Sequence, residues 1–342
     1  MDVRRPRDQA SYAGILTFSG AGVVLDPEGL RGVDVAVVGA PIDETVSYRP
    51  GARFGPRAIR AAGYGAGLPH LAAGVSPLEA LTVVDYGDAG VIPADPARSH
   101  AAIREIVGEI ARAGVVPLVL GGDHSIAHPD VGAVADAVRP EQVGLVHFDA
   151  HADDAEEVHG VTRSHGTPLR HLVNEGSIRG GHVVQIGLRG YWPGPGEFAW
   201  ARERGFRWYL MEEVDRRGVD VVVDETVAHL AGVPHVFLSV DVDVCDPAFA
   251  PGTGTPEPGG MTAGDLLRSV RRLCAGLPIR GLEIVEVSPP YDQAEITSLL
   301  AHRVALEALT GIALRRSGRS PEPFLDGRAQ GDPGSSPAGG RM

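Results

Sequence analysis

Cysteine is scarce in this chain of 342 residues, which contains only Cys245 and Cys274. Two thiols provide neither a disulfide framework nor a cysteine-rich zinc site. Long apolar runs are absent as well. No segment approaches the ~18 consecutive apolar residues that span a membrane, and no apolar stretch of secretory length follows the early arginines. We therefore expect a cytoplasmic protein that does not bind a membrane.

Positive charge is also in short supply. Lysine and arginine together number 31 against 44 aspartates and glutamates, and the formal net charge is -13. Proteins that bind nucleic acids usually present a concentrated basic face, so this balance argues against a nucleic-acid partner. A small cationic substrate would suit the acidic field of the chain.

The pattern of apolar residues indicates alternating strands and helices. Eight apolar runs have the character of buried strands: 33–41, 81–90, 115–124, 143–151, 182–190, 206–211, 235–244 and 281–290. Helical spacing occurs between them at 97–113, 126–138, 263–274 and 297–315. Regular alternation implies crossover connections between parallel strands. We therefore predict an α/β fold of three layers, α/β/α, with a largely parallel central sheet.

Neither a repeat nor a linker interrupts this pattern, so we predict a single domain over residues 13–316. Residues 1–12 are polar, and residues 317–342 are rich in glycine, proline and serine without hydrophobic periodicity. Segments of this composition cannot bury enough apolar surface to fold. We expect a flexible N-terminus and a disordered C-terminal tail.

Acidic residues and histidines follow three of the predicted strands. The clusters are Gly121-Gly122-Asp123-His124-Ser125, Asp149-Ala150-His151-Ala152-Asp153 and Asp241-Val242-Asp243. In parallel α/β folds, ligands lie beyond the carboxyl ends of the strands. Alternate residues on an extended backbone point to the same side, so the polar side chains of each cluster can face one point.

Each cluster has an ordinary explanation when it is taken alone, such as a polar loop, a helix cap or a strand-to-turn junction. Their coincidence at three strand ends favours a metal site, because four ionised carboxylates beside two imidazoles need cations to compensate their charge. Six ligands, several able to bridge, indicate two ions roughly 3.5–4 Å apart. Oxygen-rich ligation with some imidazole and no thiolate favours Mn²⁺, with Ni²⁺, Co²⁺ or Fe²⁺ as the other candidates.

These clusters resemble the signature segments of the ureohydrolase (arginase/agmatinase) family, in particular its agmatinase-like branch. The third cluster continues as SVDVDVCDPAFAPGTGTPEPGG (239–260). Supporting stretches are RPGARFGPRAIR (49–60), SHGTP (164–168), GLEIVEVSPPYD (281–292) and TSLLAHRVALEALTG (297–311). The resemblance covers about residues 33–315. It implies the arginase-like fold and a homo-oligomer, either a trimer or a hexamer.

The resemblance also assigns roles to the polar residues of these segments. Two Mn²⁺ ions would be held by His124, Asp149, His151, Asp153, Asp241 and Asp243, with Asp149 and Asp241 as bridges. The ions would activate a water that attacks a guanidinium carbon. Asp153 would pass its proton to the leaving amine, Glu286 would bind the guanidinium, and His165 would shuttle protons. Without the resemblance, Glu286 could be a strand-end surface residue and His165 a solvated loop histidine.

The amino-acid clamp of arginases is missing from the sequence. Arginases carry an Asn two residues after the last aspartate of the Asp-Ala-His-x-Asp motif and a Ser four residues before the shuttle histidine. Ala155 and Val161 occupy these positions here. We therefore predict an amidinohydrolase that converts a linear guanidino compound, agmatine or a guanidino acid such as 4-guanidinobutyrate, to urea and the amine.

The loop between Asp153 and His165 should shape the far end of the substrate pocket. Candidate residues for the substrate tail are Glu156, Glu157, Arg163, Tyr191 and Trp192. The two glutamates would receive an ammonium, and the arginine would receive a carboxylate. The aromatic residues would line an apolar wall or serve as packing contacts.

Other functions stay open at this stage. A formimino-group hydrolase would keep the metals and release formamide, and a non-catalytic relative would bind polyamines or partner proteins on the same fold. The family strand usually reads Leu-Asp-x-x-Glu, whereas this chain has Glu283 at the Asp position, where the longer side chain could repack the floor of the site. Together with the divergent loop 153–163, this departure keeps specialised amidinohydrolases of secondary metabolism among the alternatives.

Overall fold

The computed structural model describes residues 13–64, 67–192 and 194–319. The flexible N-terminus predicted for residues 1–12 lies outside the described residues. So do residues 320–342 of the predicted tail.

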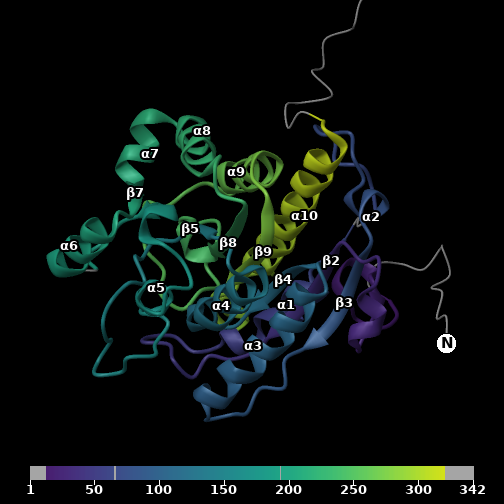
Figure 1. Cartoon of the computed structure of the whole chain (residues 1–342), viewed down its shortest axis with the longest axis horizontal. Coiled ribbons are helices and arrows are strands. Elements are labelled where there is room, and N and C mark those ends of the chain that lie inside the picture. The colour runs from purple at the N-terminus through teal and green to yellow at the C-terminus, as the bar shows by residue number, and fades with distance from the viewer. Residues whose placement is uncertain (1–12, 65–66, 193, 320–342) are drawn as a thin grey trace, which may run out of the picture.

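Within the described residues, the core of the fold is a parallel sheet of nine strands (Figure 1). The strands are β1 (Gly22–Val23), β2 (Val35–Ala40), β3 (Val83–Asp88), β4 (Val116–Gly121), β5 (Val143–Phe148), β6 (Val183–Leu188), β7 (Arg207–Leu210), β8 (His235–Asp241) and β9 (Ile279–Val285). Each of the eight predicted apolar runs contains one strand. The sequence analysis missed β1, because two residues are too short to show a pattern.

Helices connect the strands. They are α1 (Gly55–Ala61), α2 (Pro77–Ala80), α3 (Pro96–Arg112), α4 (Ala127–Val138), α5 (Pro168–Asn174), α6 (Pro195–Arg204), α7 (Met211–Arg217), α8 (Val219–Leu230), α9 (Ala263–Gly276) and α10 (Ile296–Ser317). The four predicted helices correspond to α3, α4, α9 and α10. The missed ones are short, apart from α8, whose valine-rich sequence obscures a helical pattern because β-branched residues are also typical of strands.

Two apolar cores cover the two faces of the sheet. Alternate strand residues point to opposite faces, so Val37 and Val146 join the core formed with α8, α9 and α10. Val38 and Leu145 join the core formed with α3, α4 and α5. Figure 1 shows α9 and α10 on one side of the sheet and α3 and α4 on the other. The predicted three-layer α/β/α architecture is thus confirmed.

Among the described helices, α10 alone is long and apolar enough to cross a membrane by length and composition. In this fold, 78% of its apolar window is buried, and it packs against α9. A core helix of a globular domain passes the same composition test, and α10 occupies that position here.

The order of the strands decides which loops meet. The sheet runs β1-β3-β2-β4-β9-β8-β5-β6-β7, so β4, β9, β8 and β5 are neighbours at its centre. Their carboxyl ends lie at the same edge because the strands are parallel. All three polar clusters of the sequence follow strands of this central group.

Candidate active site

Four neighbouring strands bring the predicted site residues together. The segments that leave β4, β9, β8 and β5 carry His124, Glu286, Asp241 and Asp149, respectively. All four side chains are buried. The backbone amide of His124 donates a hydrogen bond to Oε1 of Glu286 at 3.0 Å although the two residues are 162 positions apart. The site is therefore a product of the strand order.

Short turns after the strands orient the acidic side chains. Oδ1 of Asp149 accepts a hydrogen bond from the amide of His151 at 2.6 Å, and Oδ1 of Asp241 accepts one from the amide of Asp243 at 2.8 Å. Aspartate side chains commonly close such turns with the backbone two residues on. The turn uses Oδ1 of each carboxylate, and Oδ2 of each carboxylate faces His124.

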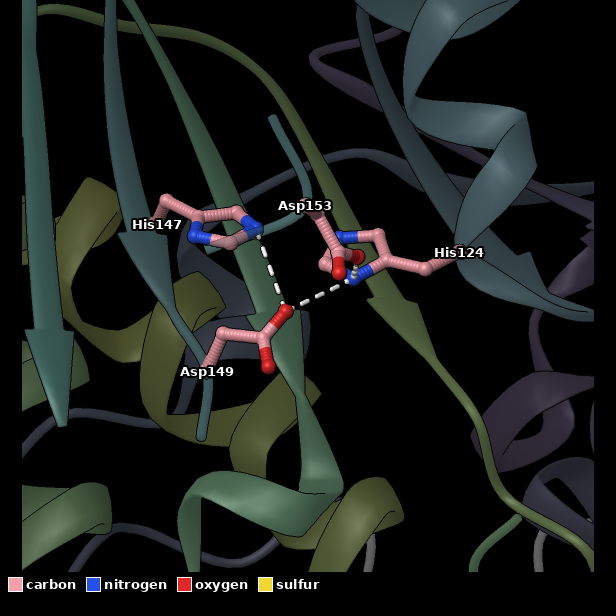
Figure 2. A group of neighbouring side chains, drawn as sticks. All are labelled: His124, His147, Asp149 and Asp153. Carbon is pink, nitrogen blue, oxygen red and sulfur yellow. Dashed lines mark ion pairs between the residues drawn. The ribbon is translucent and has the colours of Figure 1, made fainter. Parts of the chain in front are cut away.

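The first group of possible metal ligands surrounds His124. Its Nδ1 lies 2.9 Å from Oδ2 of Asp149, 2.9 Å from Oδ2 of Asp153 and 3.3 Å from Oδ2 of Asp241. Figure 2 shows the carboxylates of Asp149 and Asp153 both facing the same nitrogen of His124. Ligand atoms of His124, His147, Asp149 and Asp153 are close enough together to share one ion, and Asp241 borders this group through its contact with His124.

The second group shares Asp149 with the first. Nδ1 of His151 lies 3.4 Å from Oδ1 of Asp149 and 3.1 Å from Oδ2 of Asp243. Oδ2 of Asp243 also accepts a hydrogen bond from the hydroxyl of Thr255 at 3.2 Å. The two oxygens of Asp149 therefore face two different groups, as a bridging carboxylate would.

The electrostatics of this arrangement call for cations. Burial disfavours a charged imidazole, yet Asp149, Asp153 and Asp241 together raise the pKa of His124 well above its usual range. Burial, and then the charges of Asp243 and Asp149, raise the pKa of Asp241. Within the described residues, neither Nδ1 of His124 nor Oδ2 of Asp149 has a hydrogen bond of acceptable geometry. Carboxylate oxygens with imidazole nitrogens fit divalent cations that would satisfy these atoms.

The thiol nearest to the site in sequence takes no part in it. Cys245 is buried and unpaired. Burial raises the pKa of this thiol to about 12, so it is not a thiolate at neutral pH. Cys245 therefore acts as an apolar side chain of the core.

His147 is a site residue that the sequence analysis did not single out. Its Nε2 lies 3.2 Å from Oδ2 of Asp149 (Figure 2). Nε2 of Gln185 donates to the carbonyl of Ala152 at 2.7 Å and lies 3.4 Å from Nδ1 of His147. An amide donor at Nδ1 leaves the proton on Nε2, facing Asp149. His147 therefore orients the shared carboxylate, and its position two residues before Asp149 on the same strand was the available signal.

His165 and Glu286 form a buried pair. Nδ1 of His165 lies 3.0 Å from Oε1 of Glu286, and Nε2 lies 2.8 Å from the hydroxyl of Ser47. Burial works against the charged imidazole, but Glu286 and then Asp153 raise the pKa of His165 to about 9. Oε2 of Glu286 is buried and has no hydrogen-bond partner among the described residues. One oxygen of this carboxylate thus remains available for a cationic ligand.

Two of these residues have a strained backbone. Asp153 has a φ of 47° and Glu286 a φ of 63°, values in the left-handed region that residues with a side chain rarely adopt. Such strain is kept where the surrounding structure fixes it, often at functional sites. Here the strained backbone lies at the two residues whose buried carboxylates contact the site.

A cavity of about 320 Å³ opens beside these side chains. Of the predicted site residues, its wall includes His151, Asp153, Glu157, His165, Trp192 and Asp241. It also includes residues that the sequence analysis did not single out as candidates, although Gly166 and Thr255 lie in the quoted family segments and Val158 and His159 lie in the loop expected to shape the pocket; the remaining one is Ser47. Ser47 lies in a loop without a recognisable spacing, so the sequence carried no signal for it.

Three of the candidates for the substrate tail are not part of the described cavity wall. Glu156 is exposed, and Tyr191 is fully exposed. Arg163 lies 3.9 Å from Oε1 of Glu175 and lines a separate, much smaller cavity beside His128. The structure therefore brings Glu157 and Trp192 to the cavity and leaves these three outside it.

Comparison with known proteins gives the context of this site. The profile of the Arginase family matches residues 33–311. The chain belongs to the arginase family. It is 42% identical over 281 residues to "Agmatinase, mitochondrial" of Gallus gallus, covering 82% of this chain and 81% of that protein. It is 39% identical over 307 residues to "Guanidino acid hydrolase, mitochondrial" of Homo sapiens, covering 90% and 85%.

A solved structure agrees with the assignment of this chain to the arginase family. The structure of proclavaminate amidinohydrolase from Streptomyces clavuligerus superposes with a TM-score of 0.81 at 38% identity, covering 90% of this chain and 100% of that one. The resemblance noted in the sequence and the fold class are both confirmed.

Glu283, which stands where the family usually has Asp, lies on the side of His124 that faces away from Asp149. Nε2 of His124 lies 2.8 Å from the hydroxyl of Ser239 and 3.7 Å from Oε1 of Glu283. Glu283 lies beside Asp130 of α4, and the four carboxylate oxygens of this pair are buried without hydrogen-bond partners in the described chain. Burial, and next the charge of Glu283, raise the pKa of Asp130 well above its usual range. The longer side chain at position 283 is thus accompanied by a second carboxyl group.

We predict that Asp130→Asn stabilises the protein at neutral pH. The raised pKa keeps Asp130 protonated in the folded protein where an unfolded aspartate, with a pKa of ~3.9, has ionised. Unfolding then releases a proton, so native stability falls as pH rises above about 4. The variant lacks this titration, so it should be more stable than the native protein near pH 7, and the difference should shrink as pH falls toward about 4.

Calorimetric melting across pH tests this prediction. The difference in melting temperature between variant and native protein should grow from acid to neutral pH. Asp215→Asn on α7, where the side chain is exposed, serves as the control and should show no such trend. A difference that stays constant with pH would contradict the prediction.

Proposed function

We propose that this chain is a binuclear metal hydrolase that cleaves a linear guanidino compound to urea and an amine. The observation that carries the proposal is the pair of ligand groups joined by Asp149, with the free carboxylate oxygen of Glu286 at the same sheet edge. The names of the relatives, an agmatinase and a guanidino acid hydrolase, support this substrate class. A guanidinium is a planar cation that a carboxylate binds through paired hydrogen bonds.

Two Mn²⁺ ions are the proposed cofactors. His124, Asp149, Asp153 and Asp241 would hold one ion, and Asp149, His151, Asp241 and Asp243 would hold the other. When bound, two such cations supply Lewis acidity that lowers the pKa of water toward neutrality. The oxygen-rich donor set supports manganese over zinc.

Side chains of this protein would bind the substrate, transfer protons and orient the ligands. Glu286 would hold the guanidinium and fix its carbon opposite the ligand cluster. Asp153 would accept a proton from the attacking water and pass it to the leaving amine. His165 borders the cavity and contacts Glu286, and it would exchange protons with solvent. His147 would keep Asp149 oriented throughout.

Arginine is an unfavourable substrate for this pocket. Ala155 is buried, and Val161 is half exposed in a small hairpin. Neither side chain offers a hydrogen bond to an amino-acid head group, since both are apolar. A buried polar clamp is what normally gives strong discrimination for such a group. We therefore propose a substrate without an α-amino acid head.

We propose a cytoplasmic homo-oligomer, either a trimer or a hexamer, that acts on a small molecule without a nucleic-acid or membrane partner. Both cysteines are buried and unpaired, which is compatible with a reducing compartment. Light scattering of the purified chain would establish the number of subunits.

The function is tested by urea release from manganese-loaded protein. Agmatine, 4-guanidinobutyrate, 3-guanidinopropionate and arginine should be compared at equal concentration. We expect urea from at least one of the first three, and arginine should be turned over at least about 100-fold less efficiently. Formamide from a formimino substrate without any urea, or no product at all, would overturn the proposal.

A further inference from the structure

The wall of the 320 Å³ cavity changes in character from its inner end to its outer end. Asp153 and Asp241 are buried and belong with His151 to the proposed metal site at the inner end. Apolar surface follows, made by Trp192, whose ring lies edge-on to His151 at 6.0 Å, and by Val158. Glu157 and His159 are exposed and mark the outer end. This sequence of surfaces suits a molecule with a cationic head and a short alkyl chain.

A small hairpin forms the outer part of the wall. The backbones of Val158 and Val161 exchange two hydrogen bonds, of 3.0 and 2.9 Å. His159 and Gly160 between them have φ values of 52° and 79°, as a two-residue turn of this kind requires. The turn fixes the backbone of Val158, which directly follows Glu157.

Gly166 fixes the hairpin against the rest of the wall. A Cβ atom at this position would lie 3.0 Å from Cγ2 of Val158 and 3.2 Å from the ring of Trp192. Both side chains thus pack directly on the glycine backbone. This packing holds the apolar part of the wall together and keeps Glu157 at the cavity.

The described cavity wall contains no arginine, and the chain contains no lysine. The arginines nearest to it in sequence are engaged elsewhere. Arg163 faces Glu175, and Arg49 stacks 5.1 Å from the ring centroids of Tyr48 and Tyr291. Arg189 donates hydrogen bonds to several backbone carbonyls. A carboxylate at the far end of the cavity would therefore meet Glu157 without a permanent cation to balance it.

We propose that Glu157 receives the distal group of the substrate and that this group is a cation, so the preferred substrate is an alkylguanidine with a terminal ammonium. This inference rests on the proposed function and narrows its substrate class. An ammonium would gain a charge-assisted hydrogen bond at Glu157, whereas a carboxylate would be repelled. The net charge of -13 acts in the same direction.

Three substrates of similar length test the proposal, namely agmatine with an ammonium tail, 4-guanidinobutyrate with a carboxylate tail and butylguanidine with an apolar tail. For the native protein, kcat/KM for agmatine should exceed that for 4-guanidinobutyrate by at least about tenfold. Glu157→Gln should lower kcat/KM for agmatine about tenfold, mainly through KM. The ratio of kcat/KM for agmatine to that for butylguanidine should fall, because butylguanidine has no tail charge for Glu157 to bind. Glu157→Arg should shift the preference toward 4-guanidinobutyrate.

Glu156→Gln is the matched control, because Glu156 precedes Glu157 on the same loop and is equally exposed but is not part of the described cavity wall. It should not alter the ratio of the two kcat/KM values. Circular dichroism and metal content verify that each variant is folded and loaded. A native preference for 4-guanidinobutyrate, or equal effects of the two glutamine variants, would overturn this inference alone. Urea from none of the three substrates would instead overturn the proposed function.

Discussion

Asp149→Ala is expected to abolish metal-dependent activity, lowering kcat by more than about 10³-fold. The two oxygens of Asp149 face two separate groups of ligands, so the substitution removes a ligand from both proposed ion sites. The Lewis acidity of such ions contributes several kcal/mol to catalysis, and each 1.36 kcal/mol corresponds to a factor of ten in rate. Elemental analysis of the dialysed variant should show less bound manganese than the native protein.

The same variant should lose the stabilisation that metal gives to the native protein. A ligand that binds only the folded state stabilises it by about 2.7 kcal/mol at a concentration 100-fold above its Kd. Melting curves with and without manganese should therefore differ for the native protein and nearly coincide for Asp149→Ala. Asp215→Ala, at an exposed position on α7, should behave as the native protein does. Full metal content in the Asp149 variant would contradict the proposed bridge.

Glu286→Gln should lower kcat/KM by about 10²-fold or more while metal content stays unchanged. The glutamine keeps the size of the side chain and an oxygen that can accept the hydrogen bond from the amide of His124. It removes the negative charge that a guanidinium needs, and a hydrogen bond to a charged group contributes about 1.5–3 kcal/mol. Glu286 is not among the proposed ligands, so an intact metal site with weak activity is the distinctive outcome.

The pKa of His165 gives a second measurement on the same variant. Glu286 is the largest of the influences that raise this pKa to about 9, and burial alone would lower it. NMR titration of the metal-free variant should therefore show the pKa of His165 falling toward ~6.5 or below. Glu203→Gln on α6, where the side chain is exposed, should leave it unchanged. An unaltered pKa of His165 in the Glu286 variant would show that Glu286 does not raise this pKa.

Prediction from the sequence succeeded where one strand and its turn contain the whole signal. The alternate spacing of Asp149, His151 and Asp153 after a buried run predicted a common site, although the structure forms it with a turn at Asp149 and a left-handed backbone at Asp153 and not with an extended strand. The structure brings them together with His124, and their role as metal ligands stays a prediction to be tested by metal analysis. The apolar alternation also predicted the layers of the fold, since buried parallel strands and amphipathic helices have different periods.

Residues that act through distant neighbours could not be predicted in this way. Nothing in the sequence relates Asp130 to Glu283, because their proximity depends on α4 packing across β9. Arg163 and Glu157 stand six positions apart in one loop, yet one faces Glu175 and the other faces the cavity. The direction of a loop side chain depends on the tertiary contacts of the loop, which no local spacing encodes.

The sequence by itself determined the fold class, the arginase-family membership and the segments that carry the chemistry, because these depend on local patterns within single strands and turns. Only the tertiary structure decided that His147 orients Asp149, that Glu283 shares its buried space with Asp130, and that an acid borders the outer cavity with no described arginine beside it. Those relations arise between elements far apart in the chain, and the order of strands in the sheet brings them into contact.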